Sequence, residues 1–175
     1  MNLRSSVRSI PDFPQKGIMF RDITTLLADP DAFSYTIDQF YQKYKNQGIS
    51  KVIGIESRGF IVGSALASKL HCGFIPIRKP GKLPAPTYQQ EYQLEYGTDI
   101  IEIHKDALQQ NEKVLIHDDL LATGGTIEAA CHLVKKLDAQ IIGLSFIIEL
   151  KFLHARERLK EYDIYSLIQY ESEEA

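Results

Sequence analysis

The segment that most constrains the fold is QIIGLSFIIEL, residues 140–150, an almost continuous run of apolar residues. A strand with one buried face alternates apolar and polar residues, whereas a strand covered on both faces reads as a continuous apolar run. Two further apolar segments, KVIGI at 51–55 and VLIHDD at 114–119, are each followed by a turn and a helix-like pattern. Strands separated by helices pair in parallel through right-handed crossovers. The sequence therefore predicts an open parallel α/β sheet with helices on both faces.

The other elements follow from local signals. The spacing of Leu3, Val7 and Ile10 predicts a short N-terminal helix, which Pro11 and Pro14 would stop. Asp29 followed by Pro30 is typical of an N-cap and a first helical residue, so a helix is expected from there to about Gly48. The remaining expected elements are a helix at 60–70 and strands at 74–79, 99–106 and 163–170, the last at a sheet edge.

Residues 80–97 differ from the rest of the chain, because they combine prolines, glycines and three tyrosines with weak periodicity. This composition predicts a long loop with at most a marginal hairpin. Loops of this length are usually functional or disordered.

Length and charge limit the possible classes of protein. The 175 residues, 44% of them hydrophobic, predict a single domain over 1–175 that buries about 70% of the surface of its unfolded chain. The net charge of -3 gives no general attraction to nucleic acid, so an anionic ligand must meet a local group of cations. Cys72 and Cys131 are far apart and lie in apolar segments, which indicates reduced core residues. No apolar stretch approaches a membrane span, so we expect a cytoplasmic protein without nucleic-acid or membrane partners.

The segment ATGGT, residues 122–126, stands between a predicted strand and a predicted helix. Its two glycines let the backbone approach a ligand, and the start of the helix offers unpaired N–H groups for a phosphate. The segment has no Walker lysine, which favours a terminal monophosphate held by backbone amides. Asp118 and Asp119 precede it, and carboxylates accept hydrogen bonds from vicinal sugar hydroxyls. Together these residues predict a site for ribose 5-phosphate.

A second anion site is predicted at ESRG, where Ser57 and Arg58 follow the strand at 51–55. An arginine guanidinium matches the geometry of phosphate oxygens. Arg78, Lys79 and Lys82 add positive charge nearby in sequence. Because the first phosphate is already assigned to 122–126, these cations indicate a second anionic group, for which a pyrophosphate has suitable charge.

These motifs also occur together in a known family. The segment VLIHDDLLATGGT resembles the phosphoribosyl pyrophosphate signature of the type I phosphoribosyltransferases. The chain also resembles, over essentially its whole length, the members of this family that use adenine, because it carries DFPQKGIMFRDIT, ESRGF, IRKPGKLP and LEYG in this order and at these spacings. The resemblance implies that adenine and phosphoribosyl pyrophosphate react, with Mg²⁺, to give AMP and pyrophosphate in purine salvage. It also implies a homodimer whose subunit has a five-stranded parallel core, a small N-terminal hood at about 1–30 and a mobile loop at about 80–97.

The resemblance assigns roles by motif position. It implies that the 5-phosphate is bound by Ala122, Thr123, Gly124, Gly125 and Thr126, and the ribose hydroxyls by Asp118 and Asp119. Ser57 and Arg58 would bind the pyrophosphate. Arg78, Lys79 and Lys82 would approach it, with one or more of these three acting from the other subunit. The peptide before Ser57 would be cis. The base would lie by Met19, Phe20 and Arg21, where main-chain groups can read the amino edge of adenine. Catalytic roles fall to Glu95 as the carboxylate and to Arg58 and Lys82 at the leaving group, while Tyr96 would help the loop to close.

The five histidines are scattered and the sequence has no Cys or His cluster, so we expect no protein-held zinc site. Mg²⁺ would be held mainly by substrate oxygens and water. The chain departs from the family pattern at His117, where an aliphatic residue is usual, and at Lys16, where proline is frequent. We interpret His117 as a hydrogen-bonded core residue.

Two other functions stay open. A phosphoribosyltransferase for a 6-oxopurine would place a donor side chain, often lysine, against the exocyclic oxygen, and FRDI with LEYG argues against it. A non-catalytic sensor of phosphoribosyl pyrophosphate would normally need a DNA-binding module, for which this chain has no basic helix. The role of Glu95 also has two interpretations, since it could position the loop without exchanging a proton.

Overall fold

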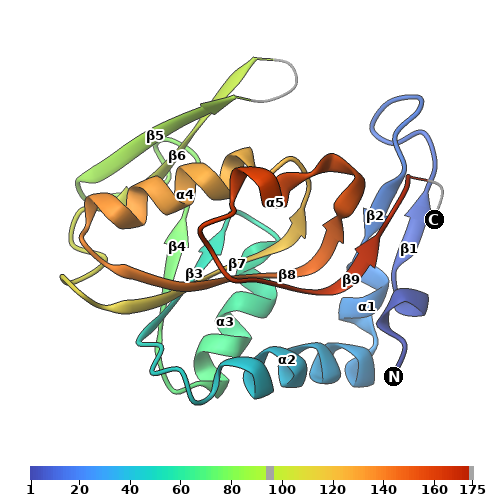
Figure 1. The fold of residues 1–175 in the computed structure, drawn as a ribbon, viewed down its shortest axis with the longest axis horizontal. Helices are drawn as coiled ribbons and strands as arrows, with labels where there is room; N and C mark the ends of the chain where they lie inside the picture. The colour runs from blue at the N-terminus through green and yellow to red at the C-terminus, as the bar shows by residue number, and fades with distance from the viewer. Residues whose placement is uncertain (94–96, 174–175) are drawn as a thin grey trace.

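A five-stranded parallel sheet forms the centre of the molecule in the computed structural model, which describes residues 1–93 and 97–173 (Figure 1). The strands run in the order β4 (Gly73–Ile77), β3 (Lys51–Ile55), β7 (Lys113–Leu121), β8 (Gln140–Leu150) and β9 (Ile164–Tyr170), and each neighbouring pair is parallel. The predicted parallel sheet is confirmed, with VLIHDD in its central strand and the last strand at its edge.

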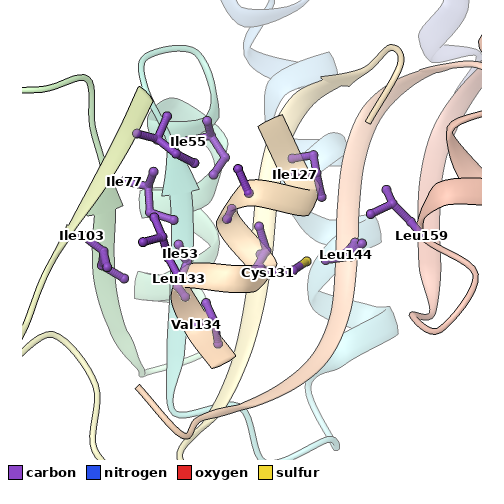
Figure 2. Close-up of a cluster of buried hydrophobic side chains, with 14 of the residues drawn as sticks. Ile53, Ile55, Ile77, Ile103, Ile127, Cys131, Leu133, Val134, Leu144 and Leu159 are labelled. Atoms are coloured by element: carbon purple, nitrogen blue, oxygen red, sulfur yellow. The ribbon is translucent and has the colours of Figure 1, made fainter. Parts of the chain in front are cut away.

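Helices cover both faces of this sheet. One face carries α1 (Thr24–Ala28), α2 (Pro30–Tyr44) and α3 (Gly59–Lys69), and the other carries α4 (Gly125–Lys136) and α5 (Ala155–Arg158) (Figure 1). Phe146 and Ile147 are neighbours in β8, yet each is fully buried in a different core cluster. The continuous apolar run therefore has the cause inferred from the sequence, because both faces of β8 are covered. Figure 2 shows Cys131 of α4 and Leu144 of β8 within the core on the α4 side.

The sequence signals for α2 are realised in detail. The side chain of Asp29 accepts hydrogen bonds from the N–H groups of Asp31 and Ala32, and Pro30 is the first helical residue. Phe40 and Tyr44 are buried against the sheet. A cap of this kind satisfies N–H groups that would otherwise have no partner at the helix start.

The predicted N-terminal helix is wrong. A short 3₁₀ helix, η1 (Leu3–Ser6), buries Leu3, and the chain then forms β1 (Arg8–Ile10), which pairs antiparallel with β2 (Phe20–Asp22). Arg8 donates to Asp22 Oδ2 from Nε at 3.1 Å and from Nη2 at 2.5 Å. Isolated helices this short are marginal, so the strand pairing and this ion pair decide the conformation.

The predicted loop at 80–97 includes part of a hairpin, which the sequence favoured only as a marginal one. There β5 (Thr87–Gln93) pairs antiparallel with β6 (Thr98–His104) over seven residue pairs. The buried Tyr92 faces the core on the α4 side, and Lys136 of α4 donates to the carbonyl of Gln89 at 3.2 Å. These contacts with α4 stabilise a hairpin that its own sequence supports only weakly. The segment expected at 99–106 is a strand, but it belongs to this hairpin and not to the central sheet.

Both cysteines are free thiols, Cys131 buried and Cys72 half-buried, and burial raises the pKa of each thiol. Within residues 1–93 and 97–173, none of the helices has the length and hydropathy of a membrane span.

Candidate active site

The turns that follow β3 and β7 come together at one edge of the sheet, and Gly59 explains how. A Cβ atom at Gly59, the first residue of α3, would lie 2.8 Å from Asp118 Oδ1 and 2.9 Å from the carbonyl oxygen of His117. The helix start can therefore contact β7 only because this residue has no side chain. As a result, Arg58 Nε lies 3.0 Å from Asp119 Oδ2, and the two predicted anion sites are joined. The peptide between Glu56 and Ser57 is cis, as the resemblance implied.

Residues 122–126, called here the phosphate turn, connect β7 to α4. Gly124 has φ of +85°, a left-handed conformation that favours glycine. A Cβ atom there would lie 3.2 Å from the Cβ of Ala155 in α5, and one at Gly125 would lie 3.1 Å from the carbonyl oxygen of Gln93 in β5. The turn thus packs closely between α5 and the hairpin. It lines a small pocket of about 80 Å³ together with Asp118, Leu120, Leu121 and Ile127.

Asp118 and Asp119, called here the acid pair, lie where burial and their mutual repulsion disfavour ionisation of both carboxyl groups. Asp119 is buried and Asp118 is half-buried. Burial raises the pKa of Asp118, and the neighbouring charge of Asp119 raises it further. Burial also raises the pKa of Asp119, although Arg58 opposes this. Hydroxyl donors or a cation placed beside the pair would favour its ionised form.

The structure allows a test of whether this site suits Mg²⁺. Within the described parts of the chain, no three His, Cys, Asp or Glu side chains converge as they would around a protein-held metal ion. Mg²⁺ prefers oxygen ligands and keeps several waters. The acid pair offers carboxylate oxygens, the ligand type that Mg²⁺ prefers, and substrate oxygens and water would have to complete the coordination.

Glu56 organises the second group of charges, and sequence reasoning gave it no role. Its Oε1 accepts hydrogen bonds from Lys82 Nζ at 2.6 Å and from Arg78 Nη2 at 3.3 Å, and its Oε2 accepts from the N–H of Lys79 at 2.8 Å. Burial alone would raise the pKa of Glu56, but these donors lower it to about 2. The only sequence signal for this role is the position of Glu56 directly before Ser57.

The side chain of Lys79 points elsewhere. Its ammonium pairs with Asp99 of β6 and donates to the hydroxyl of Tyr92 in β5 at 3.1 Å. Burial would lower the pKa of Lys79, but the hydrogen bonds to Asp99 and Tyr92 raise it. In this conformation, then, carboxylates of the chain already pair with Arg78, Lys79 and Lys82. A pyrophosphate at this edge would have to exchange with them.

A third feature is the hood pocket, a cavity of about 380 Å³ beside the N-terminal strands. Its wall brings together four separate parts of the chain and is formed by Gly17, Ile18, Met19, Phe20, Arg21, Leu120, Ala122, Leu150, Phe152, Leu153 and Glu173. The ring of Phe20 also lies 5.3 Å from Arg58 Cζ, which links the hood to the turn after β3. Sequence reasoning identified 19–21 but missed the apolar side chains at 150–153. Their signal was their position at the carboxyl end of β8, where open α/β sheets bind ligands.

Arg21 can contribute to the hood pocket mainly through its backbone. Its buried side chain lies over the ring of Tyr170, with Cζ 3.8 Å from the ring centroid. Nη1 donates to Ser9 Oγ at 2.6 Å, and Nη2 donates to the carbonyl oxygen of Glu173 at 2.7 Å. The predicted carboxylate Glu95 and the neighbouring Tyr96 lie outside the described residues, so their roles stay predictions.

The buried His117 is a hydrogen-bonded core residue, as interpreted from the sequence. Its Nδ1 lies 3.0 Å from Ser145 Oγ, and its ring packs edge to face against Phe40. Burial lowers the pKa of His117 to about 3, so the imidazole is neutral at physiological pH.

A parallel sheet that carries an acid pair and a phosphate turn at the end of its central strand defines the site of a phosphoribosyltransferase. Residues 23–174 match the phosphoribosyl transferase domain, and the chain belongs to this family.

Similar proteins within this family carry the name adenine phosphoribosyltransferase. The protein of that name from Chloroflexus aurantiacus is 58% identical over 169 residues, which cover 97% of this chain and 98% of the relative. The protein from Nostoc punctiforme is 58% identical over 172 residues, covering 97% and 100%. The crystal structure of the Thermoanaerobacter pseudethanolicus enzyme has a TM-score of 0.93 at 49% identity, covering 96% of this chain and 98% of that one. A Saccharomyces cerevisiae structure, a complex with an imino-altritol bisphosphate and adenine, has a TM-score of 0.90 at 38% identity, covering 94% and 96%.

Proposed function

We propose that this protein is an adenine phosphoribosyltransferase, which transfers the 5-phosphoribosyl group from phosphoribosyl pyrophosphate to adenine and releases AMP and pyrophosphate in purine salvage. One observation carries the proposal: Leu120 and Ala122 line both the hood pocket and the pocket of the phosphate turn. A base in the first pocket and a 5-phosphate in the second would therefore be joined through a ribose beside the acid pair. The names of the relatives agree with this arrangement.

The phosphate turn and the acid pair would hold the ribose 5-phosphate. The N-terminus of α4 presents backbone N–H groups, and Thr123 and Thr126 add hydroxyls, so the 5-phosphate is bound without a lysine. Asp118 and Asp119 would accept hydrogen bonds from the two ribose hydroxyls. These donors favour the ionised acid pair and offset the effect of burial on its pKa.

Catalysis would depend on the leaving pyrophosphate. Breaking the bond at the anomeric carbon gives the ribose oxocarbenium character, as in glycoside hydrolysis. The charge that develops on pyrophosphate would be stabilised by Arg58, Arg78 and Lys82 and by the backbone of Ser57. Arg78 and Lys82 would exchange their hydrogen bonds to Glu56 for the pyrophosphate when the substrate binds. The acid pair would help to hold Mg²⁺, which would supply positive charge beside the leaving group.

Several parts of the proposal rest on the family resemblance. Lys79 would leave Asp99 to approach the pyrophosphate, Glu95 would accept the proton from the attacking nitrogen, and Tyr96 would help residues 80–97 to close and exclude water. The functional unit would be a homodimer in the cytoplasm, with at least one basic residue of the 78–82 segment acting across the interface.

The test is nucleotide formation from phosphoribosyl pyrophosphate and Mg²⁺, with adenine, hypoxanthine, guanine or xanthine supplied separately. We expect AMP from adenine alone. Product from an oxopurine would leave the family assignment intact and overturn the choice of base. Tight binding of phosphoribosyl pyrophosphate without any product would favour a sensor.

The acid pair has its own test in the double variant Asp118→Asn with Asp119→Asn. Hydrogen bonds to charged groups contribute about 1.5 to 3 kcal/mol each, so we expect the transition-state stabilisation derived from kcat/KM for phosphoribosyl pyrophosphate to fall by a few kcal/mol. Asp38→Asn is a suitable control, because Asp38 pairs with Lys69 on the exposed surface of α2 and α3. Near-normal kinetics of the double variant would contradict the role of the acid pair.

A further inference from the structure

Residues 171–173 follow β9, and Glu173 contacts the hood. Glu173 contacts it twice: Oε1 accepts a hydrogen bond from the N–H of Met19 at 3.2 Å, and its carbonyl oxygen accepts one from Arg21 Nη2 at 2.7 Å. The buried Arg21 side chain is itself held over Tyr170, the last residue of β9. The carboxylate of Glu173 is thus placed by backbone and side-chain contacts of the hood.

Glu173 gives the hood pocket its negative charge. Among the described residues that line this pocket, it carries the only carboxylate, and most of the others are apolar. The other charged lining residue, Arg21, directs its guanidinium to Ser9, Tyr170 and the carbonyl of Glu173. An ionised carboxylate only accepts hydrogen bonds. A ligand edge facing Glu173 is therefore favoured if it carries N–H groups and disfavoured if it carries an oxygen.

The position of Glu173 in the pocket indicates which edge of a purine it would meet. The bond to ribose must form near Leu120 and Ala122, where the hood pocket adjoins the phosphate turn. Glu173 also lines a second cavity of about 220 Å³, with Pro11, Asp12, Gly17, Ile18 and Met19, to which Leu120 and Ala122 do not contribute. Glu173 thus lies on the side of the hood away from the ribose. A purine attached through its imidazole ring would present its six-membered ring and 6-substituent there.

We propose that Glu173 is a specificity-determining residue, whose carboxylate accepts a hydrogen bond from the 6-amino group of adenine and repels the oxygen of a 6-oxopurine. This inference rests on the proposed function, since it assumes that the hood pocket holds the base. The Met19 N–H already donates to Oε1 of Glu173, so Oε2 is the oxygen that would accept from the amino group.

The test compares Glu173→Gln with Glu171→Gln. Glu171 is a matched control in the same segment, because it is exposed, pairs with Lys151 at 2.6 Å and lines neither cavity. A glutamine at 173 is neutral and can turn its amide N–H groups toward an oxygen, so it should weaken adenine binding and favour hypoxanthine. For Glu173→Gln we expect KM for adenine to rise about 10-fold, while the inhibition constant of hypoxanthine falls. Glu171→Gln should change neither.

Equilibrium binding of adenine to each variant, measured calorimetrically, separates this inference from the proposed function. A native chain that makes no AMP would refute the function, whereas loss of adenine affinity in Glu173→Gln alone would still support the contact. Unchanged adenine affinity and an unchanged preference over hypoxanthine in Glu173→Gln would overturn the inference. Tighter adenine binding would also overturn it, because the carboxylate would then compete with the base.

Discussion

Gly59→Ala tests how closely α3 must approach the acid pair. The new Cβ atom would lie 2.8 Å from Asp118 Oδ1, 2.9 Å from the carbonyl oxygen of His117 and 3.1 Å from Asp118 Cα. Nonbonded carbon contacts are favourable near 3.5 to 4.0 Å, so the start of α3 must move away from β7 by about half an ångström or more. Overpacking of this kind costs about 1 to 3 kcal/mol. Alanine recovers about 1 kcal/mol of helix propensity, which leaves a net loss of about 0 to 2 kcal/mol.

The effect on activity should be larger than the effect on stability. A loss of up to about 2 kcal/mol lowers Tm by no more than about 8 °C in a protein of this size. The same movement displaces Ser57 and Arg58 from Asp119, and a misplacement near 1 Å can cost about 100-fold in rate. We therefore expect kcat/KM for phosphoribosyl pyrophosphate to fall by about 10- to 100-fold, measured by steady-state kinetics with a thermal melt of the same samples.

Gly63→Ala is the control, with the same substitution in the same helix. Its Cβ atom would meet only side chains at the closest distances, the ring of Phe74 at 3.2 Å and that of His117 at 3.4 Å. These rings can adjust without moving the helix start, so its kinetics should stay close to native. Equal activity in the Gly59→Ala and Gly63→Ala variants would refute the argument that Gly59 sets the geometry of the site.

Three further predictions follow from the charges and the hairpin. The pKa of Glu56 is lowered from an ordinary 4.5 to about 2 in the folded protein. The ionised carboxylate therefore stabilises the folded protein fully above pH 4.5, and this contribution disappears as pH falls toward 2. Urea unfolding should show a stability gap between native protein and Glu56→Gln that closes on acidification, and a gap independent of pH would contradict this. The buried Glu149 accepts hydrogen bonds from Arg156 at 2.6 and 2.8 Å, which hold α5 behind the phosphate turn. Glu149→Gln should cost about 1 to 2 kcal/mol in urea unfolding and raise KM for phosphoribosyl pyrophosphate, so a native KM would remove this role. In hydrogen exchange, protection gained on adding substrates should concentrate in 80–86, because 87–93 is already paired with β6; equal gains in both segments would count against loop closure.

Local signals predicted much of the fold. The burial of β8 on both faces and the cap at Asp29 both follow from residues adjacent in the chain. The same holds for the phosphate turn, since Gly124 and Gly125 stand between a strand and a helix whose patterns are each clear. The strand β1 and the pairing of 87–93 with 98–104 were harder to predict, because these short segments are stabilised by partners far away in sequence. Pairing with Asp22 stabilises β1, and the contact with α4 stabilises the hairpin.

The sequence by itself determined the parallel sheet and the phosphate turn, together with the acid pair beside it, because each lies within a few residues and its chemistry depends on local backbone geometry. The tertiary structure alone decided the hood pocket, which combines residues 17–21 with side chains near 120, 150–153 and 173. It also decided the pairing of Glu56 with the cations after β4. The physical reason is that contacts between distant segments depend on how the helices, the hood and the hairpin pack against the sheet. The spacing of residues along the chain does not indicate that packing.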